Sequence, residues 1–419
     1  MADVRPLRAL HYDLARVGPL AGVIAPPYDV IDPEQRAALA ARSPHNVVGV
    51  DLPAGDDPYA AAAALLREWQ DEGAVVRDEA PALWALAQDY TGPDGARRTR
   101  QGIFARVRVE DYGPGRIRPH ERTHPGPKED RLRLTRATQA NLSPIFSLYA
   151  DATGGARAAL AEVTQAAPWV QADDDDGTAN RLWRIGDPAA IAAIQAALAD
   201  AELLIADGHH RYETARVYAE EIGGEGEHRY VLMLLVALED PGLTVFPTHR
   251  LVSGLADDPA KQEALAAALR AHFTVAELAS ADELAPPEGE TVRIGYVDGH
   301  VRRPFMLTLS DDAAVAAALP GASDAYRHLD TAVLEALVLK GALGLSEDDI
   351  SHFRGLGYAR SFAEARALVD DGTYDAAFYM APTPVTRIAA VAAAGETMPP
   401  KSTYFYPKVP TGLLFNPLA

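Results

Sequence analysis

The chain has no cysteine among its 419 residues, so disulfides, thiolate metal sites and cysteine nucleophiles are excluded. It also has no apolar run near the roughly 20 residues of a membrane span, and no signal-like apolar core at its start. Basic residues are few, with 39 Lys and Arg against 59 Asp and Glu, which gives a net charge of -20. We therefore expect a cytoplasmic protein that binds neither membranes nor nucleic acid.

The residues that are present are those of an ordinary soluble globular protein. Hydrophobic residues make up 48% and charged residues 23%, and the length allows two or three domains. Strand-like and helical runs are mixed along the chain, which predicts the α+β class. Near the start, runs 23–31 and 45–53 are strand-like, and the GPDG at 92–95 predicts a hairpin turn between two β-rich runs. Further on, 292–309 predicts a second hairpin, and a mostly helical region follows it up to about residue 376.

The stretch IADGHHRYETA, residues 205–215, concentrates polar groups at the end of an apolar run. The preceding residues, around Leu203 to Ile205, predict a short buried strand, and the following residues predict a helix by their apolar spacing. The polar cluster thus falls at a strand-to-helix turn, where the positive end of the helix dipole favours an anion such as phosphate. Its members are Asp207, Gly208, His209, His210 and Arg211.

Three other stretches carry more polar chemistry than a fold alone requires. Residues 118–146 begin with a polar loop and continue into a predicted helix from about 128 to 141, although an ordinary surface helix would also explain its charges. Residues 25–31, APPYDVI, have two prolines that stiffen the backbone before Tyr28. A rigid turn without any functional role would also explain this stretch. Residues 398–416 form a proline-rich tail that either lies across the surface or completes a phosphate site. Candidate phosphate-binding residues from the first and third stretches are His120, Thr123, Lys128, Arg131, Lys401, Ser402, Thr403 and Lys408.

Five motifs occur in one order along almost the whole chain: APPYDVI, HERTHPGPKEDRL, ADGHHRYETA, MAPTP and MPPKSTYFYPK with a following PTGL. In these motifs the sequence resembles the prokaryotic family of domain of unknown function 1015. The family name by itself implies little chemistry.

A second resemblance rests on the order of the strand end IRPHE, a polar helix, the strand SPIFSLYAD and the turn in LLIADGHHRYETA. This order is similar to the ParB/sulfiredoxin superfamily core, in which a Gly-X-X-Arg turn grips nucleotide phosphates. Within that superfamily the sequence most resembles the free serine kinases. The resemblance implies that Asp207 holds Mg²⁺, that Glu121 is the catalytic base, and that ATP or ADP, or alternatively CTP, is the nucleotide.

The resemblance also implies a division of the chain. Residues 1–110 would be an N-terminal α/β region, and 111–255 the nucleotide-binding core with an insertion at about 152–200. Residues 256–370 would form a peripheral lobe, and 371–419 a strand and tail that pack back on the core.

The functional hypothesis is a Mg²⁺-dependent phosphotransferase acting on a small hydroxylated metabolite, for which free L-serine is the leading acceptor. Two alternatives remain. One is a non-catalytic CTP- or ATP-binding regulatory protein, although no basic DNA-binding module is visible. The other is a Zn²⁺ or Mn²⁺ site made of His120, Glu121, His209 and His210, although adjacent histidines point in different directions. The triplet Thr248, His249 and Arg250 is a further, weaker pocket candidate.

Overall fold

The computed structural model describes residues 2–92, 95–121, 125–287, 289–310 and 312–419. The protein is mixed α+β, as predicted, and its contacts divide it into two compact units. Unit 1 comprises Met1–Pro119, Thr123–Thr244 and Pro407–Ala419, and unit 2 comprises His120–Arg122 and Val245–Tyr406. None of the described helices is both long enough and apolar enough to cross a bilayer.

Unit 1 is built on a nine-stranded sheet in the order β6-β11-β8-β12-β5-β4-β10-β9, with β1 paired to β5. Its strands are β1 (Val4–Arg5), β4 (Leu83–Thr91), β5 (Arg97–Arg108), β6 (Ile117–Pro119), β8 (Ile145–Tyr149), β9 (Val170–Asp173), β10 (Ala179–Ile185), β11 (Leu203–Asp207) and β12 (Tyr230–Ala237). Two short pairs accompany it: β2 (Leu10–Tyr12) with β3 (Val75–Arg77), and β7 (Ala140–Asn141) with β21 (Asn416–Pro417).

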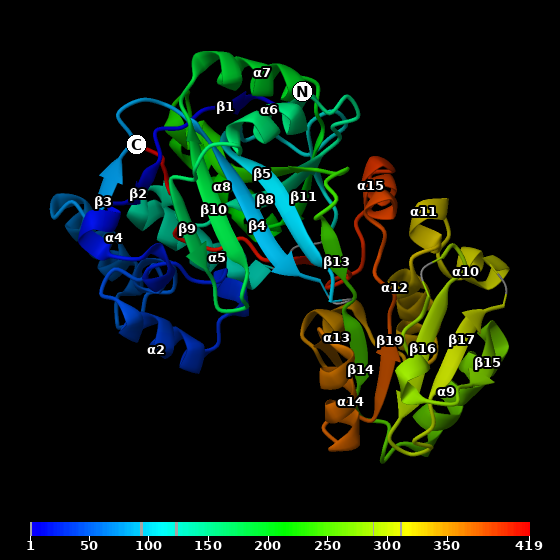
Figure 1. The fold of residues 1–419 in the computed structure, drawn as a ribbon. Helices are drawn as coiled ribbons and strands as arrows, with labels where there is room; N and C mark the ends of the chain where they lie inside the picture. Colours follow the sequence, from blue (N-terminus) through cyan, green and yellow to red (C-terminus); the bar gives the residue numbers. More distant parts are fainter. Residues whose placement is uncertain (1, 93–94, 122–124, 288, 311) are drawn as a thin grey trace. The chain divides into compact units, whose positions relative to one another are not determined.

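The large sheet is mixed in direction. The predicted first hairpin is confirmed as β4 and β5, which pair antiparallel from Trp84 opposite Phe104 to Thr91 opposite Arg97 (Figure 1). Its turn residues Pro93 and Asp94 lie outside the described residues. Strand β11 runs parallel to β6 and antiparallel to β8, while β8 and β12 are parallel. The strands of the predicted insertion, β9 and β10, extend the same sheet beyond β4.

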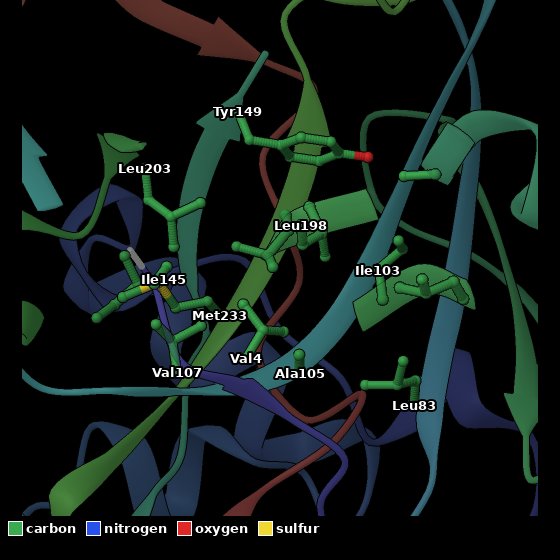
Figure 2. Packing of buried hydrophobic residues seen from close by; sticks show 14 of the residues in the cluster. Val4, Leu83, Ile103, Ala105, Val107, Ile145, Tyr149, Leu198, Leu203 and Met233 are labelled. Atoms are coloured by element: carbon green, nitrogen blue, oxygen red, sulfur yellow. The ribbon is translucent and has the colours of Figure 1, made fainter. Parts of the chain in front are cut away.

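The core of unit 1 is the apolar face of this sheet. Alternate residues of neighbouring strands, such as Leu83, Ile103, Ala105 and Val107, are fully buried there (Figure 2). Helices α6 (Gly155–Val163) and α7 (Pro188–Leu198) contribute further residues to the same cluster, among them Leu198. The period of two along each strand therefore places every second side chain in one core. Other helices of the unit are α1 (Leu14–Val17), α2 (Pro33–Arg42), α3 (Val48–Asp51), α4 (Pro58–Asp71), α5 (Pro125–Thr138) and α8 (His209–Ile222), with 3₁₀ turns η1 (Leu20–Gly22), η2 (Tyr28–Val30) and η3 (Glu227–Arg229).

An Asp-Pro pair starts each of four helices. In each pair the aspartate is the N-cap and its carboxylate accepts a hydrogen bond from the backbone N–H three residues later, while proline takes the first helical position. Both choices suit a helix start, because the cap satisfies an otherwise unpaired amide and proline has no N–H to lose. The four caps are Asp32, Asp57, Asp187 and Asp258.

The strand predicted at 45–53 is wrong, because this run forms the short helix α3. Asn46 explains the difference. Its side-chain amide donates to the carbonyls of Gly22 and Ile24, and its side-chain oxygen accepts from the N–H of Val48. A short apolar run does not distinguish a strand from a buried helical turn, and here bonds to a segment outside the run fix the turn. The run 23–31 is likewise not a strand but forms an isolated bridge at Ala25 and the turn η2.

Unit 2 has a six-stranded sheet in the order β15-β17-β16-β19-β14-β18. The strands are β14 (His249–Val252), β15 (Phe273–Glu277), β16 (Arg293–Asp298), β17 (Phe305–Leu309), β18 (Leu356–Ala359) and β19 (Ala376–Tyr379), and the short strands β13 (Thr244–Phe246) and β20 (Tyr404–Tyr406) pair separately. Its helices are α9 (Pro259–His272), η4 (Ala281–Glu283), α10 (Asp312–Ala318), α11 (Asp324–Arg327), α12 (Asp330–Val333), the π-helical η5 (Leu334–Lys340), α13 (Glu347–Ser351), α14 (Phe362–Asp370) and α15 (Val385–Ala393).

The predicted second hairpin is confirmed, since β16 and β17 pair antiparallel. The region from this hairpin to residue 376, which was expected to be mostly helical, also contains a strand, because Leu356–Ala359 forms the edge strand β18 beside β14. Four residues are too few to show a period of two, so this strand depends on its pairing with β14 and not on its own pattern.

Candidate functional site

The predicted strand–turn–helix at residues 203–222 is confirmed as β11, a tight turn and α8 (Figure 1). The turn depends on Gly208, which is the N-cap of α8 with a φ of 95°. Only glycine adopts this left-handed region without strain. A Cβ at this position would also lie 3.0 Å from Nε of Arg211, so glycine leaves room for the arginine to fold back over the turn.

Asp207, the last residue of β11, is held by two cations. Its Oδ2 accepts a hydrogen bond of 2.7 Å from Nζ of Lys408, and its Oδ1 lies 3.5 Å from Nη2 of Arg211. All three side chains are less than one-fifth exposed. Burial alone would raise the pKa of Asp207, but the charges of Lys408 and Arg211 outweigh it and hold this pKa well below its usual range. The carboxylate is therefore ionised, and the two cations leave an excess of positive charge.

Arg211 is fixed from its other side by the loop before β8. Its Nη1 donates to Oγ of Ser143 over 2.9 Å and to the carbonyl of Pro144. The Ser143 hydroxyl in turn lies 3.0 Å from that of Thr411 in the C-terminal segment. The guanidinium is thus positioned by hydrogen bonds across the turn.

A small cavity of about 40 Å³ lies next to Arg211 within unit 1. It is lined by residues of three family motifs and by neighbours that the motifs do not contain. The guanidinium of Arg131 lies 4.2 Å from the ring centroid of Tyr28 and donates to Asp51 and Asp130. Burial raises the pKa of Tyr28 to about 12 and also raises that of Asp51, although nearby arginines oppose both shifts. The polar side chains of the lining are Tyr28, Asp51, Arg131, Thr135, Asn141, Ser143, Arg211 and Thr214.

Two of the residues predicted from the loop before α5, His120 and Glu121, belong to unit 2, whereas the β11–α8 turn belongs to unit 1. His120 is almost fully buried, and its Nε2 lies 2.8 Å from Oγ1 of Thr403. The half-buried Glu121 accepts a hydrogen bond of 3.1 Å from the backbone N–H of Lys401. Ser402 is buried and donates to the carbonyl of Pro399 over 2.6 Å. Part of the predicted tail is therefore joined to the HERTHPG motif.

The remaining predicted residues are placed as follows. Lys128 on α5 lies 4.0 Å from the carboxylate of Glu213 on α8. His209 is buried in the first turn of α8 and His210 is half-buried beside it. The side chain of Lys401 is exposed, and Thr123 lies outside the described residues.

Within the described part of the chain, no group of three or more His, Asp or Glu side chains could hold a metal ion. His120 and Glu121 belong to unit 2, and His209 and His210 to unit 1. Asp207 is a single carboxylate, which suits Mg²⁺ only where phosphates and water supply the other ligands.

Sequence reasoning missed Asp51, Ser143 and the buried Arg100 of β5. Asp51 lies in the run 45–53 that predicted a strand, and Ser143 begins the run SPIFSLYAD, which was also expected to be a strand. Arg100 lies in a hairpin strand with four other arginines, so no local signal separates it from them.

A larger cavity, of about 670 Å³, lies within unit 2. Its lining includes Asp312, Asp324, His328 and Arg387 but none of the residues predicted from the sequence. We place the candidate site at the β11–α8 turn, because buried charges of opposite sign and a helix N-terminus meet there.

Fold and site together define a two-unit α+β protein with a cationic strand–turn–helix site in unit 1. The chain belongs to the family described as protein of unknown function DUF1015, whose model matches residues 4–332, which confirms the family predicted from the motifs. No curated protein matches it.

Among solved structures, a conserved hypothetical protein from Pyrococcus furiosus is 16% identical, with 74% of this chain and 93% of that chain covered and a TM-score of 0.37. A free serine kinase in complex with AMP is 15% identical over 73% of this chain and 86% of that one, with a TM-score of 0.37. SbnI from Staphylococcus aureus, truncated at its C-terminus, is 14% identical over 75% and 87%, with a TM-score of 0.38.

Proposed function

We propose that the protein is a Mg²⁺-dependent kinase that transfers a phosphoryl group from ATP or ADP to a small hydroxylated metabolite. The observation that carries the proposal is the grouping of Lys408 and Arg211 around Asp207 at the N-terminus of α8. Burying an excess of positive charge costs free energy, and the net charge of -20 shows that the chain as a whole is not rich in cations, so something at this site must offset the cost. An anionic ligand such as a polyphosphate would do so.

The parts of the turn suit phosphate binding individually. Gly208 has no Cβ, which allows a phosphate to approach the backbone, and the helix dipole adds positive potential there. Arg211 presents a planar set of donors that its bonds to Ser143 and Pro144 hold in place. His209 and His210 would donate further hydrogen bonds. Lys128, Arg131 and Thr403 stay predicted ligands, although Arg131 already binds Asp51 and Asp130.

Phosphoryl transfer also needs charge compensation and a base. Asp207 would hold Mg²⁺, which offsets the phosphate charge when it is bound. Glu121 would accept the proton of the acceptor hydroxyl, as the resemblance to the free serine kinases implies. The same resemblance, together with the ParB/sulfiredoxin-like order of the core elements, makes free L-serine the proposed acceptor.

One observation favours a second function, a non-catalytic nucleotide-binding regulator. Both carboxylate oxygens of Asp207 already face cations, so this residue would serve as a structural anchor that leaves no place for Mg²⁺. Such a site would bind CTP or ATP through Arg211 and Lys408 without turnover.

Two measurements separate these functions. Isothermal titration with AMP, ADP, ATP and CTP, with and without Mg²⁺, should show binding that Arg211→Met weakens about tenfold or more, which is one lost charge-assisted bond of about 1.5–3 kcal/mol. Arg136→Met is the matched control, because Arg136 forms an exposed ion pair with Glu221 on the same unit. Product analysis by ³¹P NMR with L-serine and other small alcohols then tests transfer. Binding without any product would support the regulator, and no binding would overturn both functions.

A further inference from the structure

Arg100 is a charged residue in the interior of unit 1. It lies in β5, is 1% exposed, and is among the largest fully buried side chains of the described chain. Burial lowers the pKa of Arg100 to about 10, and its Nε and Nη1 have no hydrogen-bond partner among the residues that the structure describes. Burying a cation with unpaired donors costs free energy, so a structural or functional gain must offset this cost.

The contacts of Arg100 lead to the C-terminal segment. Its Nη2 donates to the carbonyl of Pro407 over 2.6 Å and to the side-chain oxygen of Gln88. The guanidinium lies 4.5 Å from the ring centroid of Phe146 in β8, which stabilises it in place of the missing hydrogen bonds. The charge of Asp207 also acts on Arg100.

Gln88 holds the next carbonyl of the same segment. Its amide donates to the backbone oxygen of Lys408 over 3.1 Å and to Oδ1 of Asn180 over 2.8 Å. Arg100, Gln88 and Asn180 are direct partners in the register of β5, β4 and β10, so they form one row across three strands. This row binds two consecutive backbone carbonyls, those of Pro407 and Lys408.

We infer that Arg100 is a positioning residue, which with Gln88 fixes the backbone at Pro407 and Lys408 so that the Lys408 ammonium meets Asp207. A lysine side chain has four rotatable bonds and loses considerable entropy when it is held in one place. When the backbone of Lys408 is already fixed on a rigid sheet, less conformational entropy is lost as its side chain pairs with Asp207. The site's second cation thus depends on a residue that does not touch it.

The functional part of this inference rests on the proposed function, but the positioning part does not. Acetylation of Lys408 by an N-hydroxysuccinimide ester, followed by peptide mass spectrometry, reports directly on how the ammonium is held. In Arg100→Gln and in Gln88→Met we expect acetylation of Lys408 to become about 5- to 30-fold faster, the equivalent of about 1–2 kcal/mol of lost pairing. Lys261, an exposed lysine of α9, serves as the internal reference.

Two further variants test whether faster acetylation of Lys408 results from the loss of its positioning by Arg100. Arg106→Gln removes a different arginine of β5, one that is only partly buried, and should leave the acetylation of Lys408 unchanged. Arg100→Lys keeps the charge but can reach fewer acceptors, so it should restore only part of the protection. Thermal unfolding confirms that each variant is folded, and Gln88→Met provides the test if Arg100→Gln is not.

A nucleotide titration of the same variants tests whether the row of Arg100, Gln88 and Asn180 affects binding at the proposed site. We expect ADP or ATP affinity to fall about tenfold in Arg100→Gln and to stay unchanged in Arg106→Gln. Unchanged protection of Lys408 in both Arg100→Gln and Gln88→Met would overturn the inference. Lost protection in a protein that binds no nucleotide would uphold the positioning role and overturn the proposed function alone.

Discussion

Nζ of Lys408 lies 2.7 Å from Oδ2 of Asp207, although the two residues are 201 positions apart in the chain. The bond brings the C-terminal segment to the end of β11, where Arg211 approaches the same carboxylate. Two family motifs that are remote in sequence therefore form one site in unit 1. The carboxylate keeps both cations in place, and the cations make the site attractive to an anion.

Replacing Asp207 by asparagine separates binding from turnover. The amide is neutral, so Lys408 and Arg211 keep their full positive charge for a phosphate, and we expect nucleotide affinity to stay equal or rise. Turnover should fall to background if Asp207 holds Mg²⁺. The free energy of unfolding should drop by about 1–3 kcal/mol, because two partly buried cations lose their partner.

Urea unfolding, titration calorimetry and a kinase assay of Asp207→Asn measure these three effects. The matched control is Asp111→Asn, which removes an exposed acid paired with Arg216 in the same unit. Full turnover in Asp207→Asn would show that the carboxylate is a structural anchor only.

Gly208 provides a test of the turn itself. In Gly208→Ala the backbone must keep a φ of 95°, and the new methyl group would contact the Arg211 guanidinium. We expect a loss of about 1–3 kcal/mol in the free energy of unfolding and a clear loss of nucleotide affinity. Gly223→Ala is a close control, since Gly223 ends the same helix with a φ of 70° and an alanine methyl group there would have no atom within 4 Å. Equal affinities in the two variants would exclude the turn from the binding site.

The local parts of this site could be predicted from the sequence. An apolar run, an Asp-Gly pair and helical spacing were enough to place β11, the turn and α8, because each depends on residues close in the chain. The hairpin of β4 and β5, which was predicted from the turn residues between two β-rich runs, is a similar case.

The pairing of Lys408 with Asp207 could not be predicted, because it depends on contacts between residues distant in the sequence. Lys408 reaches Asp207 only because Arg100 and Gln88 hold its backbone, and neither of these residues belongs to a recognisable motif. The helix α3 depends on Asn46 and its bonds to a segment more than 20 positions away. Glu121 belongs to unit 2 and Asp207 to unit 1. This assignment could not be predicted from the sequence either, because the division into units depends on the contacts of the folded chain.

His249 makes the stability of unit 2 depend on pH. It is 1% exposed in β14; its Nδ1 accepts a hydrogen bond from the N–H of Met380, and its Nε2 has no hydrogen-bond partner in the described part of the chain. Burial and the neighbouring Arg250 lower the pKa of His249 to about 4, below the usual 6.5. The folded state thus keeps the ring neutral while the unfolded state binds a proton between these values. Stability should therefore be lost as the pH falls from about 6.5 to about 4, by up to about 1.4 kcal/mol per pH unit.

Calorimetric unfolding at pH 7, 6 and 5 checks this slope. In His249→Gln the side-chain oxygen can still accept from Met380, but nothing titrates, so the slope of the unit 2 transition should become shallower. His352→Gln, which removes an exposed histidine of the same unit, should leave the slope as it is. Identical slopes in His249→Gln and the unaltered protein would contradict the prediction.

Glu121 is the proposed base, and Glu121→Gln tests it without disturbing its surroundings. The amide oxygen of glutamine can still accept the hydrogen bond from the N–H of Lys401, so we expect the free energy of unfolding and nucleotide affinity to change little. An amide cannot take up the proton of an acceptor hydroxyl, and turnover should fall by about 10²–10⁴-fold. Glu129→Gln, which removes an exposed acid of α5, should keep full turnover. If Glu121→Gln also turns over at the normal rate, another group accepts the proton, and the assignment that the sequence resemblance implies is wrong.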